Sequence, residues 1–178
     1  HCFAFDLLSN PDYRDIVPEA RLRIIAVIAR AAGPLGMVGG QYLDVVNEGR
    51  EIAYDLLRTI HRSKTGALIT AAVLAGGIAG GASAGQQQQL TSYGNAVGLA
   101  FQIVDDILNV EATPEQLGKA VGSDAARGKA TYPALFGLAK SKTMAADAVA
   151  AATVALDGFG DDAEPLRALA RYIMHRTT

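Results

Sequence analysis

Two adjacent carboxylates, Asp105 and Asp106, lie inside an apolar stretch of sequence, A-V-G-L-A-F-Q-I-V-D-D-I-L-N, at residues 96–109. The stretch predicts a helix that is apolar almost all round, and such a helix belongs in the middle of a protein. Spacings of three and four residues place Gln102 and Asn109 on the same side as one of the carboxylates. Adjacent carboxylates in apolar surroundings remain ionised only beside a cation. Carboxylate and amide oxygens are hard ligands, which suit Mg²⁺. We therefore favour a site for Mg²⁺, alone or with a phosphate held by lysines, and the alternative is a solvated surface pair of aspartates.

A polar loop with regularly placed glycines follows at residues 117–133, L-G-K-A-V-G-S-D-A-A-R-G-K-A-T-Y-P. Its cations alternate with glycines, so side chains and exposed amides can surround phosphate oxygens. These cations are Lys119, Arg127 and Lys129. Asp124 is a candidate to hold a metal-bound water. A P-loop is excluded because the spacing from Gly122 to Gly128 is one residue too long and Ala130 stands where Ser or Thr would bind the metal. Taken alone, the segment is equally consistent with a solvated loop.

Two further polar groups are weaker candidates. Lys64 and Thr65 are predicted at a helix start, where a cation and free backbone amides meet, although a lysine in that position more often faces solvent. Gln41 and Asp44 project on one side of a predicted helix, and we interpret them as a buried pair that hydrogen bonds between helices.

The elements that must position these groups are all helical. No segment shows the alternation of a strand and no repeat is evident. Predicted helices cover residues 1–8, 19–32, 35–48, 52–62, 65–81, 90–110, 134–138, 143–156 and 164–176. Residues 82–89 are predicted to form a connector, and their four consecutive glutamines are interpreted as a solvated loop or a helix start.

Composition excludes several classes of protein. A net charge of −2 without a basic run gives no reason to expect nucleic acid as a partner. The single cysteine, Cys2, rules out an internal disulfide and fits a reducing compartment. Residues 65–84 carry no charge and are long enough to span a bilayer. They consist mainly of Ala and Gly, however, so we expect a buried core helix and no membrane span.

Four motifs occur in a fixed order: G-Q-Y-L-D, then H-R-S-K-T-G-A-L-I, then F-Q-I-V-D-D-I-L-N, then the polar loop at 117–133. This order resembles the C-terminal part of trans-isoprenyl (polyprenyl) diphosphate synthases, closest to bacterial short-chain farnesyl and geranylgeranyl diphosphate synthases. The resemblance implies an all-α, isoprenoid-synthase-type bundle of long helices around a central cavity. Residues 1–178 would form the C-terminal portion of one such domain. The N-terminal helices and the family's first aspartate-rich motif would precede His1.

The resemblance also implies roles for the acidic residues. Asp105 and Asp106 would bind Mg²⁺, the implied cofactor, and Asp124 would contact a metal-bound water. Asn109 stands where the family has a third aspartate. It keeps a ligand oxygen without the charge, so we expect a weaker metal ligand and reduced, not abolished, function.

The substrates implied by the resemblance are an allylic diphosphate and isopentenyl diphosphate. Three lysines would hold the allylic diphosphate: Lys64, Lys119 and Lys129. Gln102 and the carbonyl of Thr65 would face the allylic cation, because neutral oxygen dipoles stabilise that cation without trapping it. Phe101 would lie beside isopentenyl diphosphate.

The resulting hypothesis is a cytoplasmic, homodimeric, Mg²⁺-dependent prenyltransferase that joins the two substrates and releases diphosphate. Two alternatives stay open at this stage. One is a non-catalytic or degenerate homologue that acts as a partner subunit, which Asn109 motivates. The other is a terpene cyclase on the same fold, against which the lysine-rich loop argues.

Overall fold

The computed structural model describes residues 2–10, 12, 15–111 and 130–176. The described part of the chain is helical and contains no strand, which confirms the predicted all-α class. Helices α1 (Cys2–Ser9), α2 (Pro18–Ala32) and α3 (Met37–Val46) come first. Pro18 occupies the first turn of α2, where its missing N–H costs nothing.

A longer helical run and a hairpin follow. Helix α4 (Tyr54–His61) continues through a wide π-helical turn, η1 (Arg62–Gly66), into α5 (Ala67–Ala79). Helix α6 (Ala84–Glu111) then runs back along α5. After the segment that is not described come α9 (Tyr132–Phe136), α10 (Leu138–Val154), two short 3₁₀ turns, η2 (Asp157–Phe159) and η3 (Asp161–Ala163), and α11 (Glu164–Ile173).

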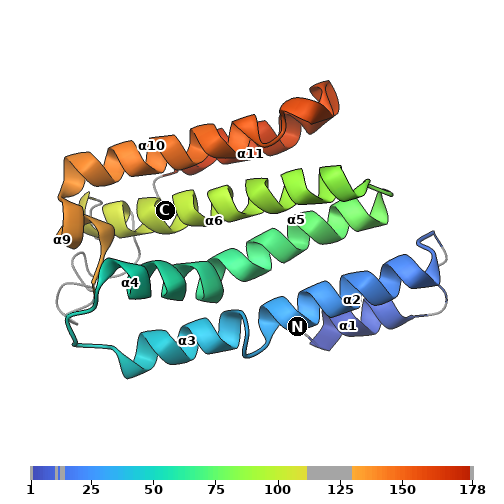
Figure 1. The fold of residues 1–178 in the computed structure, drawn as a ribbon, viewed down its shortest axis with the longest axis horizontal. Helices are drawn as coiled ribbons and strands as arrows, with labels where there is room; N and C mark the ends of the chain where they lie inside the picture. Colours follow the sequence, from blue (N-terminus) through green and yellow to red (C-terminus); the bar gives the residue numbers. More distant parts are fainter. Residues whose placement is uncertain (1, 11, 13–14, 112–129, 177–178) are drawn as a thin grey trace.

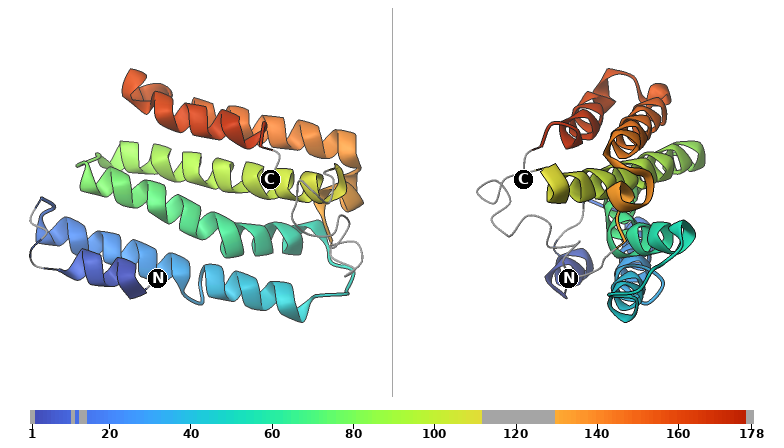
Figure 2. Two further views of the ribbon diagram at one scale, coloured as in Figure 1. Left: turned by 180° about the vertical axis from the view of Figure 1, so that it is seen from behind. Right: turned by 90° about the vertical axis from the view of Figure 1, so that its left-hand side faces the viewer.

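The helices form a layer in which α6 occupies the centre (Figure 1). Helix α6 packs between α5 on one side and α10 on the other. Seen end-on, α1 and α11 both lie on one side of this layer (Figure 2). Eleven residues of α6 are buried, among them Tyr93, Ala100 and Ile103, none of which is exposed to solvent. The prediction that the aspartate-bearing helix lies at the centre is therefore confirmed.

The start of α6 corrects one prediction. Residues 84–89 are helical, so the connector is shorter than predicted and the glutamine run forms a helix start. The backbone N–H of Ser83 donates to Gln86 Oε1 at 2.9 Å, and the N–H of Gln86 faces Ser83 Oγ at 3.3 Å. This reciprocal pair is a capping box, S-x-x-Q, which satisfies backbone donors at a helix start. The glutamine run hid a signal that was present in the sequence.

Two other expectations need correction. Helix α10 begins at Leu138, five residues earlier than predicted, because Gly137 separates it from α9 with a φ of 77°. In α5, only Ala71 and Ile78 are buried, so this helix is not the fully buried core helix that its composition suggested. A small residue of α6 permits the close contact between the two helices, because a Cβ on Gly94 would lie 2.6 Å from the Cα of Thr70 on α5.

In the described residues, one helical run is long and apolar enough to cross a membrane by length and composition. It covers Pro18–Val46, 29 residues with a mean hydropathy of 1.5. The test is weak because core helices of soluble proteins also pass it. The run is divided by the turn at residues 33–36 into two helices that are each too short to span a bilayer.

Candidate active site

The two adjacent aspartates of α6 lie in different environments. The side chain of Asp105 is 45% exposed, whereas Asp106 is only 4% exposed. Successive residues of a helix point about 100° apart, so the two carboxylates face different neighbours. They are therefore not equivalent.

Asp106 faces inward toward α9. Its Oδ2 accepts a hydrogen bond of 2.9 Å from the backbone N–H of Tyr132. The ring of Tyr132 is fully buried, stacks on His61 and meets Tyr54 edge-on at 6.0 Å. Burial is the main cause that raises the pKa of Tyr132, and the neighbouring Tyr54 and Asp106 raise it further. Asp106 thus fixes the start of α9 to the central helix.

Asp105 faces a cation from the end of the described chain. Nη2 of Arg176 lies 3.4 Å from Asp105 Oδ1 and donates to the carbonyl oxygen of Phe101 at 3.1 Å. The guanidinium carbon lies 3.9 Å from the centroid of the Phe101 ring, within the range of a cation–π interaction. No sequence pattern predicts this contact, because Arg176 and Asp105 are 71 residues apart.

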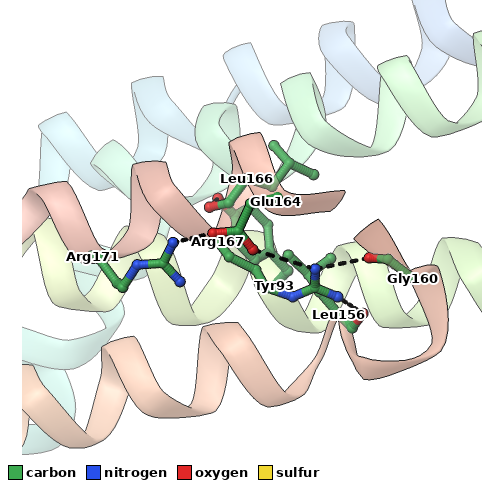
Figure 3. Close-up of polar contacts among 7 residues, drawn as sticks. All are labelled: Tyr93, Leu156, Gly160, Glu164, Leu166, Arg167 and Arg171. Atoms are coloured by element: carbon green, nitrogen blue, oxygen red, sulfur yellow. Dashed lines mark hydrogen bonds and ion pairs between the residues drawn. The ribbon is translucent and has the colours of Figure 1, made fainter. Parts of the chain in front are cut away.

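Helix α11, which precedes Arg176, is held by contacts of its own (Figure 3). Arg167 donates to the carbonyl oxygens of Gly160 and Leu156, both at 2.8 Å. The hydroxyl of Tyr93 on α6 donates to the carbonyl oxygen of Leu166 at 2.7 Å. On the exposed side of α11, Glu164 pairs with Arg171 and Arg167. These contacts dock α11 on the central helix.

Lys64 lies in the wide turn η1, and its Nζ is 2.6 Å from Oδ2 of Asp44 on α3. The backbone is helical from Tyr54 to Ala79, so the predicted helix start at Lys64 and Thr65 is wrong. Gln41 is exposed, so the predicted buried pair is wrong for Gln41. Asp44 does make a hydrogen bond between helical elements, as predicted, but to Lys64. The observed ion pair instead connects a predicted substrate-binding lysine to α3.

Glycines allow the turn η1 to sit close to the flanking helices. A Cβ on Gly40 of α3 would lie 2.2 Å from the backbone nitrogen of Lys64. A Cβ on Gly98 of α6 would lie 2.8 Å from the Cα of Gly66. Wide π-type turns within helices are frequent at functional sites. Here the turn carries Lys64 and Thr65.

The remaining predicted residues divide into two groups. Phe101, Gln102 and Asn109 lie on α6 with the aspartates; Phe101 and Gln102 are half-buried, and Asn109 is 3% exposed. Lys119, Asp124 and Lys129 lie outside the described residues. The structure therefore describes the predicted site residues on η1 and α6, but not those of the polar loop.

The donor chemistry fits a magnesium ion at Asp105. Among the described residues, no group of three or more His, Cys, Asp or Glu side chains is placed to hold a metal. Mg²⁺ does not require such a cage, because it keeps several waters and binds one or two carboxylates together with substrate phosphates. Asp105 presents a carboxylate in that manner, and a guanidinium already stands beside it as a cation.

Comparison with known proteins gives consistent matches. Residues 2–158 match the family model "Polyprenyl synthetase". The chain is 47% identical to the farnesyl diphosphate synthase of Geobacillus stearothermophilus over 84% of this chain and 50% of that protein. It is 41% identical to the farnesyl diphosphate synthase of Escherichia coli K12 over 97% of this chain and 59% of that one.

Solved structures agree with these matches. A farnesyl/geranylfarnesyl (FPP/GFPP) synthase from Zymomonas mobilis superposes with a TM-score of 0.82 and 33% identity, over 97% of this chain and 57% of that one. A geranyltransferase from Helicobacter pylori, solved with magnesium and isoprenyl diphosphate, superposes with a TM-score of 0.80 and 26% identity, over 98% and 56% of the two chains.

The chain therefore belongs to the polyprenyl synthetase family, the trans-prenyl diphosphate synthases. Within this family it is similar to short-chain members, namely bacterial farnesyl diphosphate synthases and a chloroplastic geranylgeranyl pyrophosphate synthase of Arabidopsis thaliana. It spans about half the length of the relatives that it matches.

Proposed function

We propose that the whole protein is a short-chain prenyltransferase that joins an allylic diphosphate to isopentenyl diphosphate and releases diphosphate. The observation that carries this proposal is the family match over residues 2–158, in which the relatives are named farnesyl and geranylgeranyl diphosphate synthases. The separate environments of Asp105 and Asp106 support it, since a half-exposed carboxylate on a buried helix is suited to bind a ligand.

We propose Mg²⁺ as the cofactor, and the magnesium named in the Helicobacter pylori structure supports this choice. Asp105 would hold the ion directly, and Asp106 would hold the start of α9. When bound, Mg²⁺ neutralises charge that develops on the departing diphosphate. Lys64 would add a positive charge to the same leaving group, once diphosphate oxygens replace Asp44 as its partner.

The cation left by the leaving group needs dipoles and no nucleophile. Gln102 lies one turn before the aspartates on α6, and Thr65 lies in the turn η1 that packs against the same helix. Their neutral oxygens would stabilise the cation without capturing it. The apolar side chains of α6 would keep water from the site, because water would quench the cation.

We also propose that the whole protein is a homodimer. Exposed apolar side chains on α2 and α3 support an interface there: Leu22, Val38, Tyr42 and Val45. A cytoplasmic location remains a prediction, because the relatives include both bacterial proteins and chloroplastic plant proteins.

The test is an assay of the full-length protein with isopentenyl diphosphate, dimethylallyl or geranyl diphosphate, and Mg²⁺. We expect a prenyl diphosphate longer than the allylic substrate, together with released diphosphate. A cyclised hydrocarbon formed from the allylic substrate alone would identify a cyclase. The absence of any product, in protein that is folded and binds the substrates, would contradict the proposal.

A further inference from the structure

The guanidinium of Arg176 lies beside Asp105, the proposed metal ligand. The Arg176 side chain is only 10% exposed, and its Nη2 lies 3.4 Å from Asp105 Oδ1. A unit positive charge at this distance competes with any other cation for the same carboxylate.

Arg176 is held incompletely. A charge-assisted N–H···O⁻ bond is usually 2.7–2.9 Å long, so the contact with Asp105 is a weak one. Within the described part of the chain, Nε of Arg176 is buried without a hydrogen-bond partner. Of its five N–H donors, those on Nη2 face the Phe101 carbonyl oxygen at 3.1 Å and Asp105 Oδ1 at 3.4 Å. The side chain is therefore positioned by charge and by stacking on Phe101 more than by a complete set of hydrogen bonds.

The anchoring of α11 does not depend on Arg176. Arg167 and Tyr93 fix α11 through backbone carbonyl oxygens upstream of residue 167. Beyond Ile173, the backbone is held by one turn, in which the N–H groups of His175 and Arg176 donate to Tyr172. Arg176 can therefore leave Asp105 while α11 stays in place.

We propose that Arg176 is an internal counter-ion that competes with the divalent cation for Asp105. Without metal, the guanidinium neutralises the carboxylate; when a divalent cation occupies Asp105, the like charge displaces Arg176 from it. The affinity of the substrate-free protein for metal is lowered as a result, so the metal is retained mainly when an anionic substrate accompanies it. This inference rests on the proposed role of Asp105 as a metal ligand.

The experiment measures Mn²⁺ binding to the full-length, substrate-free protein by electron paramagnetic resonance at fixed ionic strength. We expect Arg176→Gln to bind the ion at Asp105 about three- to tenfold more tightly than the unsubstituted protein, because one nearby positive charge is removed. Arg176→Lys, which keeps the charge, should stay near the original affinity. Arg171→Gln is the matched control, since Arg171 pairs with Glu164 on the same helix, and it should change nothing.

A double-mutant cycle with Asp105→Asn separates the possible outcomes. In the Asp105→Asn background, Arg176→Gln should no longer alter Mn²⁺ affinity. Equal affinity of Arg176→Gln and the unsubstituted protein, while Asp105→Asn still weakens binding, would overturn the counter-ion but leave the proposed function intact. No effect of Asp105→Asn on affinity would overturn the metal-binding role itself. Arg176→Met, which keeps the apolar stem on Phe101, replaces the Gln variant if circular dichroism shows that the latter is unfolded.

Discussion

Neighbouring aspartates of one helix lie in different environments in this protein. Asp106 is buried and accepts the Tyr132 N–H, so its carboxylate belongs to the packing of α9 on α6. Asp105 is half-exposed, and among the described residues it forms an ion pair with Arg176. At the scale of single residues, we therefore predict that substitutions can separate structural support from the proposed ligand binding.

This separation predicts opposite profiles for two substitutions in the full-length protein. Asp105→Ala should lower kcat by about 10²-fold or more, because a group that stabilises the leaving group is lost, with little change in stability. Asp106→Ala leaves a buried N–H without its acceptor and should reduce the free energy of unfolding by about 1–3 kcal/mol. Urea unfolding and steady-state kinetics would check both. Equal loss of stability in the two variants would contradict the assignment.

Asn109 provides a second comparison on the same helix. Asn109→Ala should lower turnover by much less than Asp105→Ala, because a neutral amide contributes less to metal binding than a carboxylate. Its side chain is buried, so some loss of stability is expected as well. Rates measured at saturating Mg²⁺ would rank the two residues. Similar losses of turnover in both variants would refute the ranking.

The raised pKa of Tyr132 predicts that the free energy of unfolding falls at alkaline pH. Burial raises its folded-state pKa above the ordinary value of 10, so its stabilising effect is complete below pH 10 and declines as pH rises above it. One such group reduces the free energy of unfolding by about 1.4 kcal/mol per pH unit in that range. Tyr132→Phe should make the dependence between pH 10 and 11 shallower, measured by urea unfolding. The same change at Tyr172, which is 63% exposed, is the control and should leave the pH dependence unchanged.

At the scale of elements, the sequence predicted which segments are helical but not how each helix starts or joins the next. Apolar periodicity identified the central helix, and proline and glycine marked the ends of α2. The pattern could not reveal that α4 and α5 are one helical run through η1, because the wide turn depends on glycines that are distant in sequence, Gly40 and Gly98. The ion pair of Lys64 with Asp44 was missed for the same reason.

The close approach of η1 to α6 can be tested through Gly98. Gly98→Ala should destabilise the full-length protein by about 1–3 kcal/mol, because the added methyl group would lie 2.8 Å from the Cα of Gly66 and would push η1 away. Activity should fall too, since Lys64 and Thr65 move with that turn. Gly76→Ala in α5 is the control, because a Cβ there meets nothing within 4 Å. It should stabilise by about 0.5–1 kcal/mol, as measured by thermal unfolding.

At the scale of the whole molecule, the described helices leave an apolar surface on α2 and α3. Tyr42 is 66% exposed and Val38 is 52% exposed. A homodimer that uses this surface predicts that Val38→Glu in the full-length protein gives a monomer in light scattering coupled to size exclusion. Lys140→Glu, on α10, is the control and should remain dimeric. A dimer that survives Val38→Glu would place the interface elsewhere.

The wide turn at Arg62–Gly66 also sets the rotational phase between two parts of one helix. An α-helix advances by about 100° per residue, so a chain shorter by one residue at this point would carry α4 round by that angle relative to α5. Leu57 and Ile60, which are now buried, would then face solvent. Tyr54 would lose its edge-to-face ring contact with Tyr132. The extra residue is thus a spacer, and we expect the fold of this turn to tolerate substitution more readily than deletion.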